Sequence, residues 1–412
     1  MKFNLKKIRA SVLQFSILIA TLVALLLLSF ITLTHTHRFF KIQSDNFRAT
    51  IDNAQEGIIL SLEPDFKEGE IISEKENSQL DISTSYWGGF QKVTSVATKD
   101  SKTFSQMALV GALAENKRTA LYLVDNNNAL VLVGNTNIEG LSYIPSKGVK
   151  AGSIAGNYYN GKNLISGEIR HSNSRLPKLH PTFLNFIKAL QKTPDVSESL
   201  VVLEGELKNS FFEKEKVVYS PDMIVFTGKA TGNMRIQSDR EVTIDTYAQL
   251  TDVTIVAPII RVQEGFNGRV HLIASDSIVI EKNVVLNYPS SLVLSEKSDS
   301  KDNEFASIEI EEPSTIQGIV IHLQNREPEK ATPNIVISKG ASIEGEVYCE
   351  GHLELLGKVN GTVYTNKFLV RAPGGVYINH LYDGSISAKE LPQEFSGLPL
   401  EKSTKGIVQW LY

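Results

Sequence analysis

Residues 343–370 have the sequence IEGEVYCEGHLELLGKVNGTVYTNKFLV, and the motif IEGEVY at its start returns sixteen residues later as VNGTVY. Apolar and polar residues alternate in both copies, and glycines stand at matching places. A period of two sends every second side chain of a strand to the same face. This stretch therefore predicts β-strands that are stacked copies of one structural unit.

The pattern extends back to about residue 222 with a step of eighteen residues. Four segments align at this step, namely DMIVFTGKA (222–230), REVTIDTYA (240–248), PIIRVQEGF (258–266) and DSIVIEKNV (276–284). Two later segments, 334–342 and 352–360, repeat the step after an insert at 294–307. Each segment contains one pair of apolar residues two positions apart, and these pairs superpose on one another. The pairs are Ile224 with Phe226, Val242 with Ile244, Ile260 with Val262, Ile278 with Ile280, Ile335 with Ile337, and Leu353 with Leu355.

The repeats predict a β-solenoid over residues 201–390. A single coil cannot bury its own apolar face, whereas a stack of coils buries a continuous core. In this assignment Val262 points inward and Arg261 points outward. Because the spacing drifts between sixteen and eighteen residues, a right-handed β-helix is favoured. The alternative is a β-sandwich of hairpins, in which strands would not recur in register at a fixed step.

The N-terminus predicts a membrane anchor. Residues 11–34 contain no charged residue, and a basic leader precedes them at 1–10. As a helix, this run rises about 36 Å, which exceeds a hydrocarbon core of about 30 Å. No small-x-small cleavage site follows it. We expect a retained transmembrane helix in the inner (cytoplasmic) membrane of a bacterium. The basic flank places the N-terminus in the cytoplasm and the bulk of the chain in the periplasm or outside.

Between the anchor and the repeats we expect three segments. Residues 35–64 continue the helix as an amphipathic extension that ends at Pro64, and the polar residues 65–84 form a linker or loop. Residues 85–200 form a middle β-rich domain. Within that domain, DNNN at 125–128 predicts a hairpin turn, because Asn tolerates positive φ.

Two apolar segments outside the repeats also carry predictions. HPTFLNFIKALQKTP, residues 180–194, has the spacing of a helix. The tail at 391–412 ends in IVQWLY, which is costly to expose to water. We expect the tail to fold back onto the chain, either as a cap over the last coil or along the side of the stack. The alternative is that it docks on a partner.

Two families show related patterns. Residues 335–388 resemble bactofilins, the polymer-forming cytoskeletal proteins, and a looser likeness extends back to about residue 222. The leader, the apolar helix and NAQEG at 53–57 are similar to PilX-type minor pilins. These resemblances imply a β-helix and a pilin-like anchor. The glutamate of major pilins is replaced by Gln14 or Phe15, and Ala10 is the small residue nearest to a prepilin cleavage point.

The composition argues against several functions. A formal net charge of -4 gives no general basic field for nucleic acid. The single cysteine, Cys349, excludes an intrachain disulfide and a thiol-rich zinc site, and we expect it to be a packing or surface residue.

Some β-helices cleave polysaccharides, so carboxylates of the repeats are candidates for catalysis. Gln263 stands at the matching position of the repeat between two of them and interrupts the row of carboxylates. They are Asp239, Asp245, Glu264, Asp276 and Glu281.

The histidines do not have the spacing of a metal site. His35 and His37 flank the membrane segment, and His271, His322 and His352 fall in separate repeats. We therefore predict no catalytic, cofactor or metal site. The sequence predicts a non-enzymatic, membrane-anchored structural protein of the cell envelope, with a β-solenoid for assembly or presentation, or a component of a pilin-like filament. Its partners would be the lipid bilayer, through residues 11–34, and proteins or further copies of itself. The alternative is an envelope protein that binds or cleaves polysaccharide.

Overall fold

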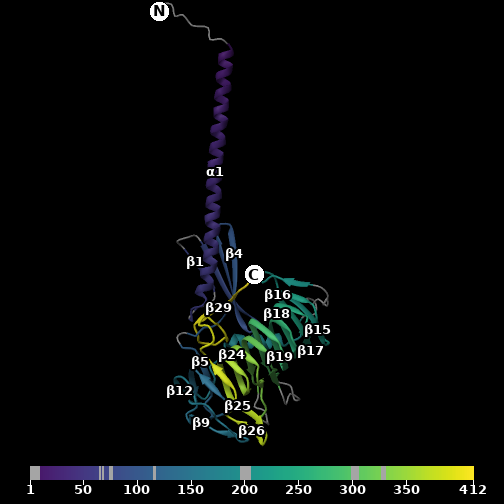
Figure 1. Cartoon of the computed structure of the whole chain (residues 1–412). Helices are drawn as coiled ribbons and strands as arrows, with labels where there is room; N and C mark the ends of the chain where they lie inside the picture. The colour runs from purple at the N-terminus through teal and green to yellow at the C-terminus, as the bar shows by residue number, and fades with distance from the viewer. Residues whose placement is uncertain are drawn as a thin grey trace, which may run out of the picture. The chain divides into compact units, whose positions relative to one another are not determined.

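A computed structural model describes residues 10–64, 66, 69–73, 78–114, 117–194, 206–297, 306–325 and 331–412 (Figure 1). The protein is mainly β, with one long N-terminal helix and a β-rich body. The chain forms two compact units. The first comprises residues 1–57, 69–82 and 95–106, and the second comprises 58–68, 83–94 and 107–412.

The first unit is dominated by helix α1 (Ala10–Leu60), which is 51 residues long. The apolar run and the predicted extension therefore form one continuous helix, although it ends at Leu60 rather than at Pro64. Its large apolar side chains from Val12 to Leu33 are exposed, and by length and composition the helix is a candidate membrane span. Near its end, a Cβ on Gly57 would lie 2.2 Å from Oγ of Ser95, so only glycine allows this close approach.

A small sheet has the strand order β1-β2-β3-β4-β29. Its strands are β1 (Gly69–Ser73), β2 (Ser78–Trp87), β3 (Phe90–Lys99), β4 (Lys102–Ala112) and β29 (Lys405–Trp410). The prediction of a linker or loop at 65–84 was wrong for residues 69–73 and 78–84, which pair antiparallel from Gly69–Ile82 to Ser73–Ser78. Backbone hydrogen bonds sustain this pairing, so a polar composition does not prevent it.

The main sheet is mostly parallel and closes into a barrel-like ring. Figure 1 shows its arrows running side by side along the body, for example β16, β18, β19 and β24. From residue 206 onward its strands are β13 (Glu206–Asn209), β14 (Lys216–Ser220), β15 (Ile224–Phe226), β16 (Lys229–Ser238), β17 (Glu241–Ile244), β18 (Gln249–Val262), β19 (Asn267–Ile280), β20 (Val285–Ser295), β21 (Ser307–Ile310), β22 (Thr315–Leu323), β23 (Ile335–Ile337), β24 (Ser342–Leu355), β25 (Lys358–Ala372), β26 (Gly375–Ile378) and β28 (Ser385–Ser387).

The predicted alignment of the apolar pairs is confirmed by the register of this sheet. One row of directly paired residues consists of Ile224, Val242, Ile260, Ile278, Ile308, Ile335 and Leu353. A second row, two residues further along each strand, consists of Phe226, Ile244, Val262, Ile280, Ile310, Ile337 and Leu355. Every member of both rows is buried, whereas Arg261, between two of them, has a side chain that is 42% exposed.

Four strands within residues 119–171 extend the same sheet, although the sequence grouped this segment with 85–200 as a separate domain. Parallel pairing joins β5 (Thr119–Leu123) to β25, and β7 (Asn137–Glu139) to β28. The sheet continues from β5 through β8 (Leu141–Ile144) to β12 (Ile169–His171). The predicted domain boundaries themselves stay predictions.

The hairpin prediction at DNNN was wrong. Strand β6 (Leu130–Val133) pairs with β27 (His380–Tyr382) and β9 (Val149–Ala151), not with β5. The local geometry was foreseen, because Asn127 has a φ of 57° and its N–H donates to the Asp125 carboxylate. The residues of DNNN therefore determined that the chain turns there. They did not determine which strands pair with one another, because those partners lie far away in the sequence. A minor pair, β10 (Ser153–Ile154) with β11 (Asn157–Tyr158), completes the strands.

A second apolar core lies on the other face of the main sheet, because residues next to the inward ones point the opposite way. Val256, Ile273 and Val293 contribute to it from β18, β19 and β20. The predicted helix is confirmed as α2 (Pro181–Leu190), which buries Phe183, Ile187 and Leu190 in this core. The Trp87–Phe90 turn and the C-terminal tail contribute further apolar side chains, among them Leu398 and Leu411.

The C-terminal tail folds back onto its own chain, as predicted. Strand β29 pairs antiparallel with β4, from Lys405–Ala112 to Trp410–Ala108. The tail also contacts Glu346 of β24 and Asp252 of β18. The tail therefore packs against strands that lie within the sheet.

Candidate functional site

The five candidate carboxylates do not gather into one site. Asp239 accepts a hydrogen bond from the Tyr219 hydroxyl at 2.6 Å, and Asp245 accepts one from the N–H of Tyr247. The others are likewise held by nearby turns and strands, since Asp276 accepts from Ser275, Glu281 accepts from the N–H of Glu264 and pairs with Arg261, and Glu264 accepts from Asn283. Local structure accounts for each of these contacts.

The histidines and the cysteine have separate environments. Among the described residues, no group of three His, Cys, Asp or Glu side chains is arranged to hold a metal ion. His322 contacts Glu296 at 3.1 Å, and His35 and His37 lie on the exposed part of α1. Cys349 is buried in β24, and burial raises the pKa of its thiol to about 12. Because the thiolate is the nucleophile, this cysteine acts as a packing residue.

His271 and Ser291 resemble a base and nucleophile, with Nδ1 2.8 Å from Oγ, but both side chains are fully buried. The turn of Gly88 and Gly89 lies directly over them. A Cβ on Gly88 would be 2.2 Å from Cγ of His271, and one on Gly89 would be 2.6 Å from Cβ of Ser291. The Trp87 ring is 4.4 Å from the imidazole, so no space for a substrate remains. The pair is a docking contact for the turn.

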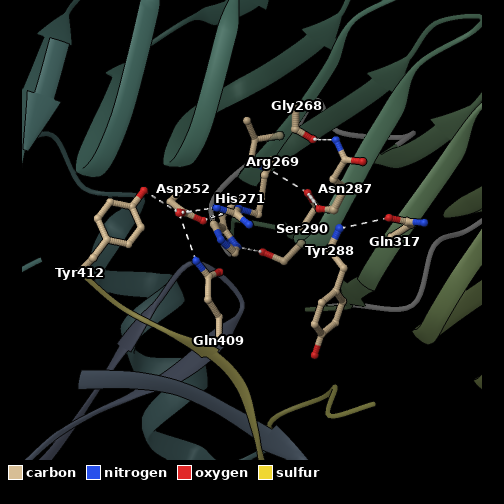
Figure 2. Close-up of polar contacts among 12 residues, drawn as sticks. Asp252, Gly268, Arg269, His271, Asn287, Tyr288, Ser290, Gln317, Gln409 and Tyr412 are labelled. Atoms are coloured by element: carbon tan, nitrogen blue, oxygen red, sulfur yellow. Dashed lines mark hydrogen bonds and ion pairs between the residues drawn. The ribbon is translucent and has the colours of Figure 1, made fainter. Parts of the chain in front are cut away.

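Asp252 is the centre of a buried polar cluster that holds the end of the tail. Its carboxylate is fully buried and lies 2.6 Å from Nε of Arg269. The Tyr412 hydroxyl and Nε2 of Gln409 donate to the same carboxylate at 3.0 and 3.2 Å. Figure 2 shows Asp252 between Tyr412, Gln409 and Arg269, with His271 beside them. Burial and the nearby Asp252 charge raise the pKa of Tyr412 to about 12, so the hydroxyl keeps its proton and donates.

A second buried pair holds the first part of the tail. Oε2 of Glu346 accepts a hydrogen bond from the N–H of Leu398 at 2.8 Å, and Oε1 lies 3.6 Å from Nη1 of Arg118. Nη2 of Arg118 donates to the carbonyls of Pro392 and Phe395, at 3.0 and 3.1 Å. Burial raises the pKa of Glu346, and the N–H of Leu398 and the charge of Arg118 oppose this shift.

A basic cleft of about 670 Å³ adjoins this pair. Its walls come from the end of β4, from β5, β8, β12 and β25, and from the tail around residues 400–404. Four cationic side chains line it, together with two tyrosines and several hydroxyl groups. The cations are Lys117, Arg118, Arg170 and Lys402, and the tyrosines are Tyr143 and Tyr364.

Sequence reasoning did not find this cleft. Its cations stand at 117–118, 170 and 402, and no motif or spacing connects them. They meet because β5 joins the sheet next to β25, β8 and β12 follow it, and the tail returns to the same place. The only sequence signal was the apolar tail, which predicted a fold-back but not its position.

No family model matches the chain, and neither the curated proteins nor the solved structures contain a significant match.

Proposed function

We propose that this chain is a non-enzymatic, membrane-anchored structural protein of a bacterial cell envelope. Helix α1 anchors it in the inner membrane, and the β-rich body lies on the outer side as a rigid surface for assembly or presentation. The observation that carries the proposal is the combination of an apolar helix, exposed from Val12 to Leu33, with two uninterrupted rows of seven buried residues in the main sheet. Such a stack is stiff, because each strand hydrogen-bonds to neighbours on both sides.

We further propose that the main sheet is a right-handed β-solenoid. Parallel pairing at a step of eighteen residues supports this arrangement, as in Val242–Ile260 and Ile260–Ile278. The hairpin alternative requires antiparallel neighbours, whereas the paired repeats from β15 to β24 are parallel. The likeness to bactofilins and to minor pilins suggests assembly into a filament, and the continuity of α1 through residue 60 supports a pilin-like spine.

A second candidate function is the binding of envelope polysaccharide. The basic cleft with its two tyrosines favours it, since charged and aromatic groups together bind acidic sugars. Binding and a structural role are compatible, because a wall-binding site fixes a rigid body in place.

Anchoring and topology can be tested in a bacterial host. Full-length protein should stay in the membrane pellet after a carbonate wash, and intact mass should show whether trimming near Ala10 occurs. Alkaline phosphatase, which is active only outside the cytoplasm, should be active when fused after residue 412 and inactive when fused before residue 1. Leu25→Arg with Leu26→Arg should reduce insertion, since each charge at the helix centre costs about 3 kcal/mol. Recovery of the wild-type chain in the wash, or the reverse reporter pattern, would overturn the proposal.

A further inference from the structure

We propose that the basic cleft binds an acidic oligosaccharide, that is, a short sugar chain with carboxylate groups. The inference depends on the cleft alone and does not require the membrane anchor or filament assembly. All of its lining residues belong to the second compact unit.

The charges of the cleft favour an anion, although the whole chain has a formal net charge of -4. Four cationic side chains line the cleft, and two carboxylates oppose their charge, namely Glu346 in the wall and Glu168 beside it. Glu168 contacts both Lys117 and Arg170, at 3.2 and 2.7 Å, which leaves the positive charge in excess.

Arg118 provides a second, independent indication of a ligand. Its side chain is only 7% exposed, and its Nη1 has no hydrogen-bond partner, although Oε1 of Glu346 lies 3.6 Å away. The Glu346 carboxylate supplies a negative charge at that distance, but the N–H itself lacks an acceptor, which is costly for a buried donor. An acceptor oxygen of an anion in the cleft would complete this hydrogen bond.

The aromatic and hydroxyl groups favour a sugar over a bare inorganic anion. Tyr143 and Tyr364 line the cleft with aromatic rings, which suit the C–H face of a sugar, and Ser403 adds a hydroxyl group. The guanidinium of Arg170 lies 6.0 Å from the Tyr143 ring centroid. Its contacts with Glu168 and with the Tyr143 hydroxyl hold this positive charge in the wall of the cleft. A volume of about 670 Å³ is within the range of ordinary ligand sites and leaves most of its space empty around a single phosphate.

The test uses the full chain in detergent and measures binding of trigalacturonate by calorimetry at low salt. Neutral maltotriose and inorganic phosphate are the comparison ligands. We expect saturable binding of trigalacturonate, at least tenfold weaker binding of both comparison ligands, and no new reducing ends during incubation. Arg170→Gln and Lys402→Gln should each weaken binding at least fivefold, and Arg170→Lys should weaken it less than Arg170→Gln.

Lys162→Gln is the matched control, because Lys162 is exposed and outside the cleft but the change in charge is the same. Its affinity should equal that of the wild type, and all variants should keep the wild-type melting temperature. Equal losses for Arg170→Gln and Lys162→Gln, or equal affinities for trigalacturonate and phosphate, would overturn the inference. New reducing ends would instead contradict the non-enzymatic function and leave the binding site in place.

Discussion

Glu346 of the main sheet accepts a hydrogen bond from the backbone N–H of Leu398 in the C-terminal tail, at 2.8 Å. A Cβ on the preceding residue, Gly397, would lie 2.1 Å from the same carboxylate. The tail backbone therefore lies directly on a buried acid that Arg118 supports from the other side. This contact determines where the tail returns to the sheet.

Glu346→Ala should destabilise the protein by about 3–5 kcal/mol, because it leaves a buried guanidinium without a counter-charge and a buried N–H without an acceptor. Glu346→Gln retains an acceptor for Leu398 and should cost less than half as much. Thermal unfolding of the full chain in detergent gives both values, and limited proteolysis should detect earlier cleavage in the tail of the alanine variant. Equal losses for the two variants would show that the contact with Leu398 is unimportant.

The end of the tail can be tested at two levels. Deletion of residues 406–412 removes all of β29 except Lys405, together with buried Leu411, so the chain should lose stability and begin to associate through the uncovered face. Tyr412→Phe removes only the hydroxyl that donates to Asp252 and should cost about 1 kcal/mol without association. Light scattering and melting curves measure both effects. A truncated chain that stays monodisperse with an unchanged melting temperature would indicate a docking peptide instead.

The Trp87–Phe90 turn should tolerate no side chain at Gly88. This residue has a φ of +57°, and its Cβ would overlap Cγ of His271 at 2.2 Å. Gly88→Ala should therefore cost about 3 kcal/mol or more. Gly156→Ala is the control, since its φ of +82° gives similar backbone strain but no atom lies within 4 Å. It should cost about 1 kcal/mol, and denaturant unfolding that gives the two variants the same loss would contradict the close contact.

His271 should give stability a pH dependence of known sign. Burial, with the charge of Arg269 second, lowers its pKa from 6.5 to about 3. Between these values the unfolded chain binds one more proton than the folded chain. The free energy of unfolding should therefore fall as the pH falls below 6.5, by about 1.4 kcal/mol per pH unit.

The comparison that isolates this effect is with His271→Gln, which lacks the titrating group. From pH 6.5 to pH 4.5, the wild type should lose about 2 kcal/mol more than the variant in urea unfolding. Above pH 7 the two curves should run parallel. Parallel curves over the whole range would mean that folding does not lower the pKa of His271.

The sequence predicted those features that depend on local periodicity. The pairing of Ile260 with Ile278 was predictable because apolar residues recur at a fixed step and each copy must bury the same face. The continuity of α1 followed from an uncharged run joined to an amphipathic segment.

Features that depend on pairing between distant segments were not predictable. The turn at DNNN specified the local φ of Asn127, but β5 found its partner in β25, about 240 residues later. The basic cleft depends on that pairing, since it brings Lys117 and Arg170 to the place where Lys402 returns with the tail. A single sequence contains no periodic signal for a site assembled in this way, because each segment contributes only one or two of its cationic residues.

The account depends most on the assignment of inward and outward faces in the repeats. Val262 is fully buried between Ile244 and Ile280, whereas neighbouring Arg261 is half-exposed between Glu241 and Glu281. Val262→Asp should bury an unpaired carboxylate at a cost of several kcal/mol. Arg261→Gln should change stability by no more than about 0.5 kcal/mol, as is usual for exposed ion pairs.

The decisive measurement is the melting temperature of these two variants beside the wild type, as full chains in detergent. The account predicts a large drop or complete unfolding for Val262→Asp and a shift of no more than a few degrees for Arg261→Gln. Equal shifts would contradict the stacked core on which the proposed rigid body depends.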